Sequence, residues 1–281
     1  MKNGGLFSIN DGEIKNLGLN LSNKTYQINK FGALALKNTG TIEGCNVFGA
    51  ISINCDLDSI IGGLVAENDA GIIEECFAEL NMTINAKNVS LGGLIGKSKG
   101  QVVLKNNVSN LTLVSNVNTQ KTNVGGLIGE IERSSKSKIS QNEANVEIQI
   151  SGTGKDVFVG GLIGKGSQSS ENNFTTGKIS TSLTENVSIG GLYGKYENTN
   201  LNETIKTSYS TIEIETEATK GALVGSLGGI IDSCFATQEY DFYGKELFSI
   251  TKAKNCLKAY SSSLNFDQNV WDLSQELPKL K

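Results

Sequence analysis

The chain has 281 residues, of which 38% are hydrophobic and 19% are charged, and its formal net charge is −4. These proportions are typical of a folded protein with a substantial core and exclude a disordered chain. Its 25 basic and 29 acidic residues form no blocks, which argues against nucleic acid as a partner, because backbone binding needs a concentrated basic surface.

Residue counts exclude several kinds of active site. Histidine is absent, which removes the Ser–His and Cys–His nucleophile pairs and the histidine zinc sites. Arg133 is the only arginine, so paired-arginine clamps on phosphate or carboxylate groups are excluded. The five cysteines are too dispersed for a Cys-x-x-Cys motif. We therefore predict neither a metal site nor a cofactor.

The N-terminal stretch "MKNGGLFSIN" lacks the apolar segment of a signal peptide. Elsewhere, no apolar run approaches the roughly 18–20 residues that cross a bilayer. The sequence predicts no membrane insertion. It leaves two locations open: a cytoplasmic protein, or part of a longer exported protein that is extracellular or at the cell surface.

From residue 4 onward the chain repeats a Gly-Gly-Leu-apolar-Gly motif, as in "LGGLIGK", "VGGLIGE" and "IGGLYGK". A period of about 30 residues indicates a solenoid or an array, while a propeller blade usually needs about 40 residues. The first glycines of the eight copies are Gly4, Gly32, Gly62, Gly92, Gly125, Gly160, Gly190 and Gly221.

Between the motifs lie polar turns and extended segments rich in Ile, Val and Thr, such as "IIEECFAELNMTI". Alternating, β-branched runs between polar turns are typical of strands. One such unit cannot bury an apolar face alone, whereas stacked units can. We predict an all-β fold for residues 1–238: a right-handed parallel β-helix, or β-solenoid, of about eight coils.

Stacking would place equivalent side chains above one another. The leucines would form an inward column, with the glycines allowing either a tight corner of positive φ or a close backbone approach. Whether the next apolar column, from Phe7 to Val224, is also covered is left open. The predicted structural residues of the motif are Gly5, Leu6, Leu34, Gly63, Leu64, Gly93, Leu94, Gly126, Leu127, Gly161, Leu162, Gly191, Leu192 and Leu223.

Cysteines recur at one position of the repeat. Cys45, Cys76 and Cys234 occupy equivalent places in "EGCNV", "EECFA" and "DSCFA", and Asn173 stands there in "ENNFT". A metal or redox line is one interpretation of this column. We favour the other, a stack of buried small side chains at an inner corner.

Residues 239–281 depart from the repeat and contain seven of the chain's aromatic residues. Because the open end of a solenoid recruits other chains, we predict that this segment is a C-terminal cap. Within it, "SITKAKNCLKAYSS" is a candidate for a short amphipathic helix that begins near Ser249 or Thr251.

The motifs "GGLIG", "GLVAENDAGIIEECFAE" and "GALVGSLGGIIDSCFATQ" resemble GLUG-motif repeats. The tail "FDQNVWDLSQELPKLK" is similar to the segment that often closes such regions. The resemblance implies a repeat region of a bacterial surface or secreted protein, including adhesin-like proteins, or one beside an immunoglobulin-A-specific metallopeptidase. Nothing in this chain matches the catalytic part of that peptidase.

Two functions follow as expectations. The first is a non-catalytic stalk, adhesion or interaction module, with a host or cell-surface protein or a glycan as partner. The second is a polysaccharide lyase or glycosidase on a β-helix face, with Asp56 and Asp58, or Glu74 and Glu75, as candidate carboxylates. Neighbours on a strand face opposite sides, so Glu74 and Glu75 are poorly placed to converge.

Overall fold

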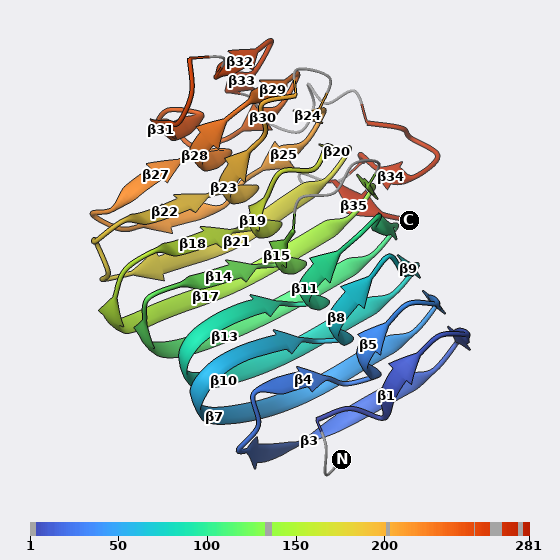
Figure 1. Cartoon of the computed structure of the whole chain (residues 1–281). Helices are drawn as coiled ribbons and strands as arrows, with labels where there is room; N and C mark the ends of the chain where they lie inside the picture. The colour runs from blue at the N-terminus through green and yellow to red at the C-terminus, as the bar shows by residue number, and fades with distance from the viewer. Residues whose placement is uncertain (1–3, 133–136, 201–202, 250, 259–265, 275–277) are drawn as a thin grey trace.

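A computed structural model describes residues 4–132, 137–200, 203–249, 251–258, 266–274 and 278–281. In these residues every regular element is a β-strand, and the strands stack as a parallel β-solenoid (Figure 1). This confirms the predicted all-β, parallel fold. The predicted number of about eight coils is close to the nine strands stacked in each of two sheets. No helix long and apolar enough to span a membrane occurs in the described residues.

Sheet A is formed by the strand that follows each glycine motif. Its strands, in stacking order, are β1 (Phe7–Asn10), β5 (Ala35–Asn38), β8 (Val65–Asp69), β11 (Ile95–Lys99), β15 (Ile128–Ile131), β19 (Ile163–Gly166), β23 (Tyr193–Glu197), β28 (Val224–Gly228) and β31 (Tyr243–Glu246).

Sheet B follows sheet A along the chain after a short turn. Its strands are β2 (Glu13–Lys15), β6 (Thr41–Glu43), β9 (Ile72–Glu74), β12 (Val103–Lys105), β16 (Lys138–Ser140), β20 (Ser170–Glu171), β24 (Thr204–Lys206), β29 (Ile230–Asp232) and β32 (Lys252–Lys254).

Sheet C completes each coil and contains the longest strands, which bend on their way back to the next glycine motif. It comprises β3 (Gly18–Tyr26), β4 (Lys30–Gly32), β7 (Asn46–Gly62), β10 (Phe77–Gly92), β13 (Val108–Thr119), β14 (Thr122–Gly125), β17 (Glu143–Gly154), β18 (Val157–Gly160), β21 (Phe174–Thr181), β22 (Val187–Gly190), β25 (Tyr209–Ser210), β26 (Glu213–Glu215), β27 (Thr219–Gly221), β30 (Phe235–Ala236) and β33 (Leu257–Lys258).

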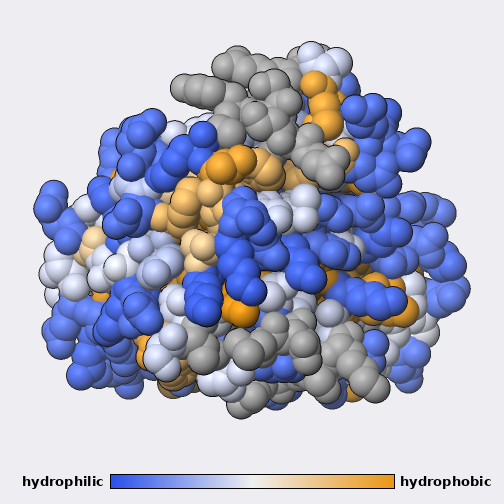
Figure 2. Space-filling view, turned by 90° about the horizontal axis from the view of Figure 1, so that it is seen from above, coloured by the Kyte–Doolittle hydropathy of each residue, from blue (hydrophilic) through white to orange (hydrophobic). Residues whose placement is uncertain are grey.

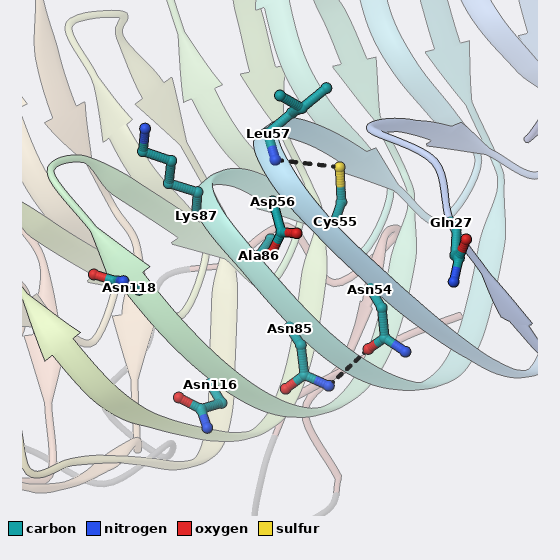
Figure 3. A pocket seen from close by; sticks show the side chains of 10 residues that line it. All are labelled: Gln27, Asn54, Cys55, Asp56, Leu57, Asn85, Ala86, Lys87, Asn116 and Asn118. Carbon is teal, nitrogen blue, oxygen red and sulfur yellow. Dashed lines mark hydrogen bonds between the residues drawn. The ribbon is translucent and has the colours of Figure 1, made fainter.

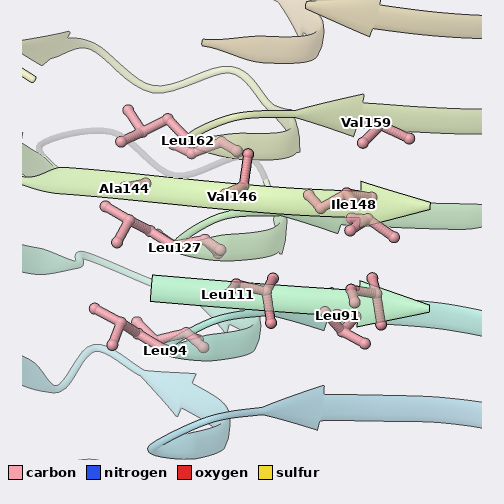
Figure 4. Close-up of a cluster of buried hydrophobic side chains, with 14 of the residues drawn as sticks. Leu91, Leu94, Leu111, Leu127, Ala144, Val146, Ile148, Val159 and Leu162 are labelled. Atoms are coloured by element: carbon pink, nitrogen blue, oxygen red, sulfur yellow. The ribbon is translucent and has the colours of Figure 1, made fainter. Parts of the chain in front are cut away.

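Period-two alternation decides which face of sheet C is buried. In β10, Leu80 and Met82 are each 2% exposed, while the neighbouring Asn81 is exposed. Parallel pairing then places apolar residues of neighbouring coils next to one another, so that Leu80 lies beside Leu111 and Leu111 beside Val146. The apolar side chains of successive coils form one continuous core along the solenoid (Figure 4).

The motif leucines lie in one column along this core. The Leu94 amide donates to the Leu127 carbonyl at 3.0 Å, and the Leu127 amide donates to that of Leu162 at 2.9 Å. From Leu34 to Leu223 the leucines are fully buried. Leu6, in the first coil, is 47% exposed, and its amide donates to the Ala33 carbonyl of the second coil at 3.0 Å.

The structure answers the question that the second apolar column left open: from Ala35 to Val224 it too is fully buried. Sheet A packs face to face against the part of sheet C that precedes each glycine pair. Because glycine has no side chain, the two main chains come into contact there. A Cβ atom on Gly129 would lie 2.4 Å from the Leu91 amide nitrogen, and one on Gly92 would lie 2.4 Å from the Leu127 carbonyl oxygen. Neither glycine has a positive φ. Here the motif therefore serves close backbone approach.

The cysteine column is a buried polar ladder at the corner between sheets B and C. In its middle, the side-chain carbonyl of Asn142 accepts from the Asn107 amide nitrogen at 3.1 Å, and its Nδ2 donates to the Ser140 carbonyl at 2.9 Å. The residue before each member has a left-handed φ, such as 55° at Glu75 and 53° at Ser233. The column comprises Cys45, Cys76, Asn107, Asn142, Asn173, Ser208, Cys234 and Cys256.

The thiols of this ladder donate to main-chain carbonyls: Cys76 Sγ lies 3.2 Å from the Glu74 oxygen and Cys234 Sγ lies 3.4 Å from that of Asp232. Burial raises the pKa of the Cys234 thiol, because the charged form loses its solvation. These contacts satisfy the corner's backbone. This is the geometry that a structural stack requires.

The predicted cap, residues 239–281, divides into two parts. Strands β31, β32 and β33 continue the three sheets for one more coil, with Cys256 next to Cys234 in the corner column. The predicted helix near Ser249 or Thr251 is therefore wrong for the described residues, while Ile250 and 259–262 lie outside them. Figure 2 looks down on this end, where hydrophilic residues surround a patch of hydrophobic ones.

The last residues lie against the side of the solenoid instead of covering its end. Strands β34 (Trp271–Asp272) and β35 (Lys279–Leu280) form a small antiparallel pair. Trp271 is 1% exposed and meets the ring of Phe174 edge-on at 6.4 Å. The Leu280 amide donates to Glu143 Oε2 at 3.2 Å, and burial raises the pKa of that carboxyl. The tail thus packs against the outer face of sheet C.

Phe174→Ala is expected to loosen the tail while the coils stay folded. The truncation removes the ring under Trp271 and should weaken docking by about 3 kcal/mol. Trp271 is the only tryptophan, so its emission should shift to longer wavelength while the circular dichroism spectrum stays unchanged. Phe48→Ala is the control, because Phe48 is 40% exposed and contacts Phe77 instead. An unshifted emission in Phe174→Ala would contradict this docking.

Sheet A carries ion pairs on its outer face, and the most buried carboxylate among them is Glu130, which is 7% exposed. Lys121 Nζ lies 2.7 Å from Glu130 Oε1, and Lys97 Nζ lies 3.8 Å from Oε2. Burial by itself would raise the pKa of Glu130, but the Lys121 hydrogen bond and both ammonium charges outweigh it and lower the pKa.

Glu130→Gln is expected to reduce stability by about 1 kcal/mol at pH 7, a value discounted because the Lys121 side chain is half exposed. The folded pKa of Glu130 lies below the unfolded one. The stabilisation by ionised Glu130 is therefore complete above the ordinary glutamate pKa of about 4.3. It is lost as the pH falls through the pKa that Glu130 has in the folded state. Urea titrations from pH 3 to pH 7 should show the free energies of unfolding of the native chain and of Glu130→Gln converging at the acid end. A difference between them that stays constant with pH would refute the ion-pair explanation.

Candidate functional site

A hollow of about 870 Å³ lies outside the bend of sheet C (Figure 3). Strands β7, β10 and β13 form its floor, and the end of the first coil forms one side. Its lining is dominated by amides and consists of Gln27, Asn54, Cys55, Asp56, Leu57, Asn85, Ala86, Lys87, Asn116 and Asn118.

Three asparagines cross the floor as one column. Asn54, Asn85 and Asn116 pair in register on successive coils, and alternation turns all three outward because Ile53 and Ile84 point inward. Asn85 Nδ2 donates to Asn54 Oδ1 at 2.8 Å. Gln27, just after the end of β3, and Asn118, two residues beyond Asn116, add two more amides to the lining.

A β-bulge shapes one wall. Ala86 pairs with Cys55, but Asn88 pairs with Asp58, so two residues of β7 stand opposite the single Lys87 of β10. Bulges re-aim side chains and often lie beside functional sites. Here the bulge pushes Leu57 out of the sheet, where its side chain is 62% exposed. An exposed aliphatic side chain thus belongs to a lining that is mostly polar.

The candidate carboxylates lie in different settings. Asp56 lines the hollow, whereas Asp58 accepts a hydrogen bond from Asn88 Nδ2 at 2.7 Å. Glu74 lies on sheet B between Glu43 and Lys105 of the adjacent coils, and Glu75 occupies the left-handed corner. Asp56 is the single carboxylate of the lining. Glycosidases place two across a cleft.

Asp56 was predicted from the sequence as a candidate residue, whereas the amide column and the bulge were not. The signal for the column was present: "INCD", "INAK" and "SNVN" place asparagine before each bend. The signal for the bulge was the longer stretch between Ile53 and Ser59 than between Ile84 and Val89. Among the described residues, no group of three or more cysteines and carboxylates could hold a metal ion.

These features define a parallel β-solenoid with a polar hollow on its longest sheet. Comparison with known protein families, with curated proteins and with solved structures finds no match. The resemblance to GLUG-motif repeats stays a prediction.

Proposed function

We propose that the chain is a non-catalytic β-solenoid module of a bacterial surface or secreted protein, where it serves as a stalk and an interaction surface. The observation that carries the proposal is the lining of the hollow. Five amides line it, with one carboxylate and one ammonium group. Amides bind without supplying the acid and base that hydrolysis or elimination requires.

The stacked backbone supports the stalk role. Main-chain hydrogen bonds link every coil to the next along the solenoid, as from Leu64 to Leu94 and from Leu94 to Leu127. Such a stack keeps outward side chains at fixed spacing. A fixed array of polar groups is pre-organised for a partner, because little side-chain or loop entropy is lost when the partner binds.

The test separates binding from catalysis. Purified chain is immobilised and exposed to panels of glycans and of host surface proteins, and in parallel it is incubated with acidic and neutral polysaccharides. Saturable binding without turnover is the expected result. Turnover that disappears in Asp56→Asn would overturn the proposal in favour of a lyase or glycosidase. Absence of any partner would reduce the module to a spacer.

A further inference from the structure

We propose that the amide-lined hollow binds an uncharged, unbranched oligosaccharide that runs across the coils along the solenoid axis. This inference rests on the proposed function and gives its hollow a ligand class.

The amides offer both a donor and an acceptor at every coil. Asn85 and Asn54 satisfy only part of their capacity with each other, because Asn54 Nδ2 and Asn85 Oδ1 form no hydrogen bond with another described residue. Each amide has two donor and two acceptor positions. Sugar hydroxyls also donate and accept, so an amide pairs with them in either direction. Asn54, Asn85 and Asn116 repeat this group on successive coils, at intervals of about 4.8 Å. A row of equal groups suits a chain of equal sugar units.

Charge excludes the strongly ionic polymers. The lining has one ammonium group, Lys87, and one carboxylate, Asp56. A nucleic acid or a polyanionic glycan needs several uncompensated cations along its path. The balanced lining favours a ligand with no net charge.

Most of the floor is closed to an extended peptide as a strand partner. Strand β10 pairs with β7 on one side and with β13 on the other as far as Ala86. A peptide that adds by β-augmentation needs a free strand edge, which is left here only at the short stretch of β7 between its pairings with β3 and β4. The only large apolar anchor is Leu57. This exposed aliphatic side chain can pack on the C–H face of a sugar ring.

The experiment measures binding by isothermal titration calorimetry. The probes are cellohexaose, laminarihexaose, maltohexaose and chitohexaose as uncharged chains, and hexagalacturonate as the anionic chain. At least one uncharged chain should bind, with a Kd that stays constant within twofold between 50 and 500 mM NaCl. Asn85→Ala and Leu57→Ala should each weaken that Kd at least tenfold, while Asn145→Ala, exposed on the same sheet outside the hollow, should leave it unchanged.

Thermal unfolding of each variant is measured first, and Asn85→Asp, which keeps the shape but loses the donor, repeats the test if Asn85→Ala unfolds. Binding that Asn85→Ala and Leu57→Ala leave intact would overturn the assignment of the site. Binding of hexagalacturonate alone would overturn the ligand class. Capture of a host protein by the native chain but not by Asn85→Ala would overturn the saccharide and leave the interaction module standing. If neither glycan nor protein binds, the saccharide proposal fails and the module is reduced to a spacer.

Discussion

Gly129→Ala is expected to lower the free energy of unfolding by about 3 kcal/mol, the upper end of the usual cost of overpacking. The added Cβ would lie 2.4 Å from the Leu91 amide nitrogen and 2.6 Å from the Gly96 carbonyl oxygen. Both atoms belong to the main chain. Leu91 is paired with Ile61 on one side and with Val124 on the other, so the backbone cannot shift without disturbing both neighbouring coils.

Urea unfolding followed by circular dichroism measures this loss. Gly18→Ala is the matched control, because a Cβ atom there meets nothing within 4 Å, and its stability should change by no more than about 0.5 kcal/mol. Equal midpoints for the two variants would show that sheets A and C are not in backbone contact at Gly129.

Asn142→Leu should cost about 3 kcal/mol or more, although it places an apolar side chain in a fully buried position. The native amide donates to the Leu104 and Ser140 carbonyls at 3.1 and 2.9 Å and accepts from the Asn107 amide nitrogen at 3.1 Å. Leucine can form none of these hydrogen bonds, so the three main-chain groups lose the Asn142 side chain as their partner. Each unsatisfied group costs about 1–3 kcal/mol.

The same urea titration measures this effect, with two comparisons. Asn142→Ser places in the column a residue that it already holds at Ser208, so part of the hydrogen bonding returns and the loss should be smaller. Asn145→Leu puts the same leucine on the exposed face of β17 and should change stability little. If Asn142→Leu unfolds at the native midpoint, the ladder does not stabilise the fold.

The sequence was sufficient for the fold because the repeat itself encodes the stacking. Eight glycine motifs at nearly constant spacing leave few ways to bury Leu94 and Leu127 together, and the structure links them by a main-chain hydrogen bond. The prediction of a helix near Thr251 was wrong because this segment was interpreted as lying outside the repeat, whereas it forms one more coil. Asn255 and Cys256 repeat the corner of Ser233 and Cys234, with φ of 50° at Asn255.

The candidate site was harder to predict, for physical reasons. Its amides come from strands whose inward residues carry the apolar pattern, so each outward asparagine taken alone looks like an ordinary solvent-facing residue, and only its recurrence before the bend marks the column. The bulge depends on two residues opposing one, which shows only after the coils are in register. The tail's position depends on Phe174 and Tyr209, which stack on the outer face of sheet C beneath it and which no local pattern marks as a docking surface.

The contact between Leu280 and Glu143 has a consequence for the order of folding. Bonds between successive coils join residues about one repeat apart, for example 30 from Asn38 to Asn68 and 35 from Asn107 to Asn142, whereas the tail contact joins residues 137 apart. Short loops close early and long ones late. Growth can therefore nucleate at any pair of neighbouring coils and propagate both ways, while the tail must wait until the surface carrying Glu143 and Phe174 exists. Burial of the lone indole then marks the last step of assembly.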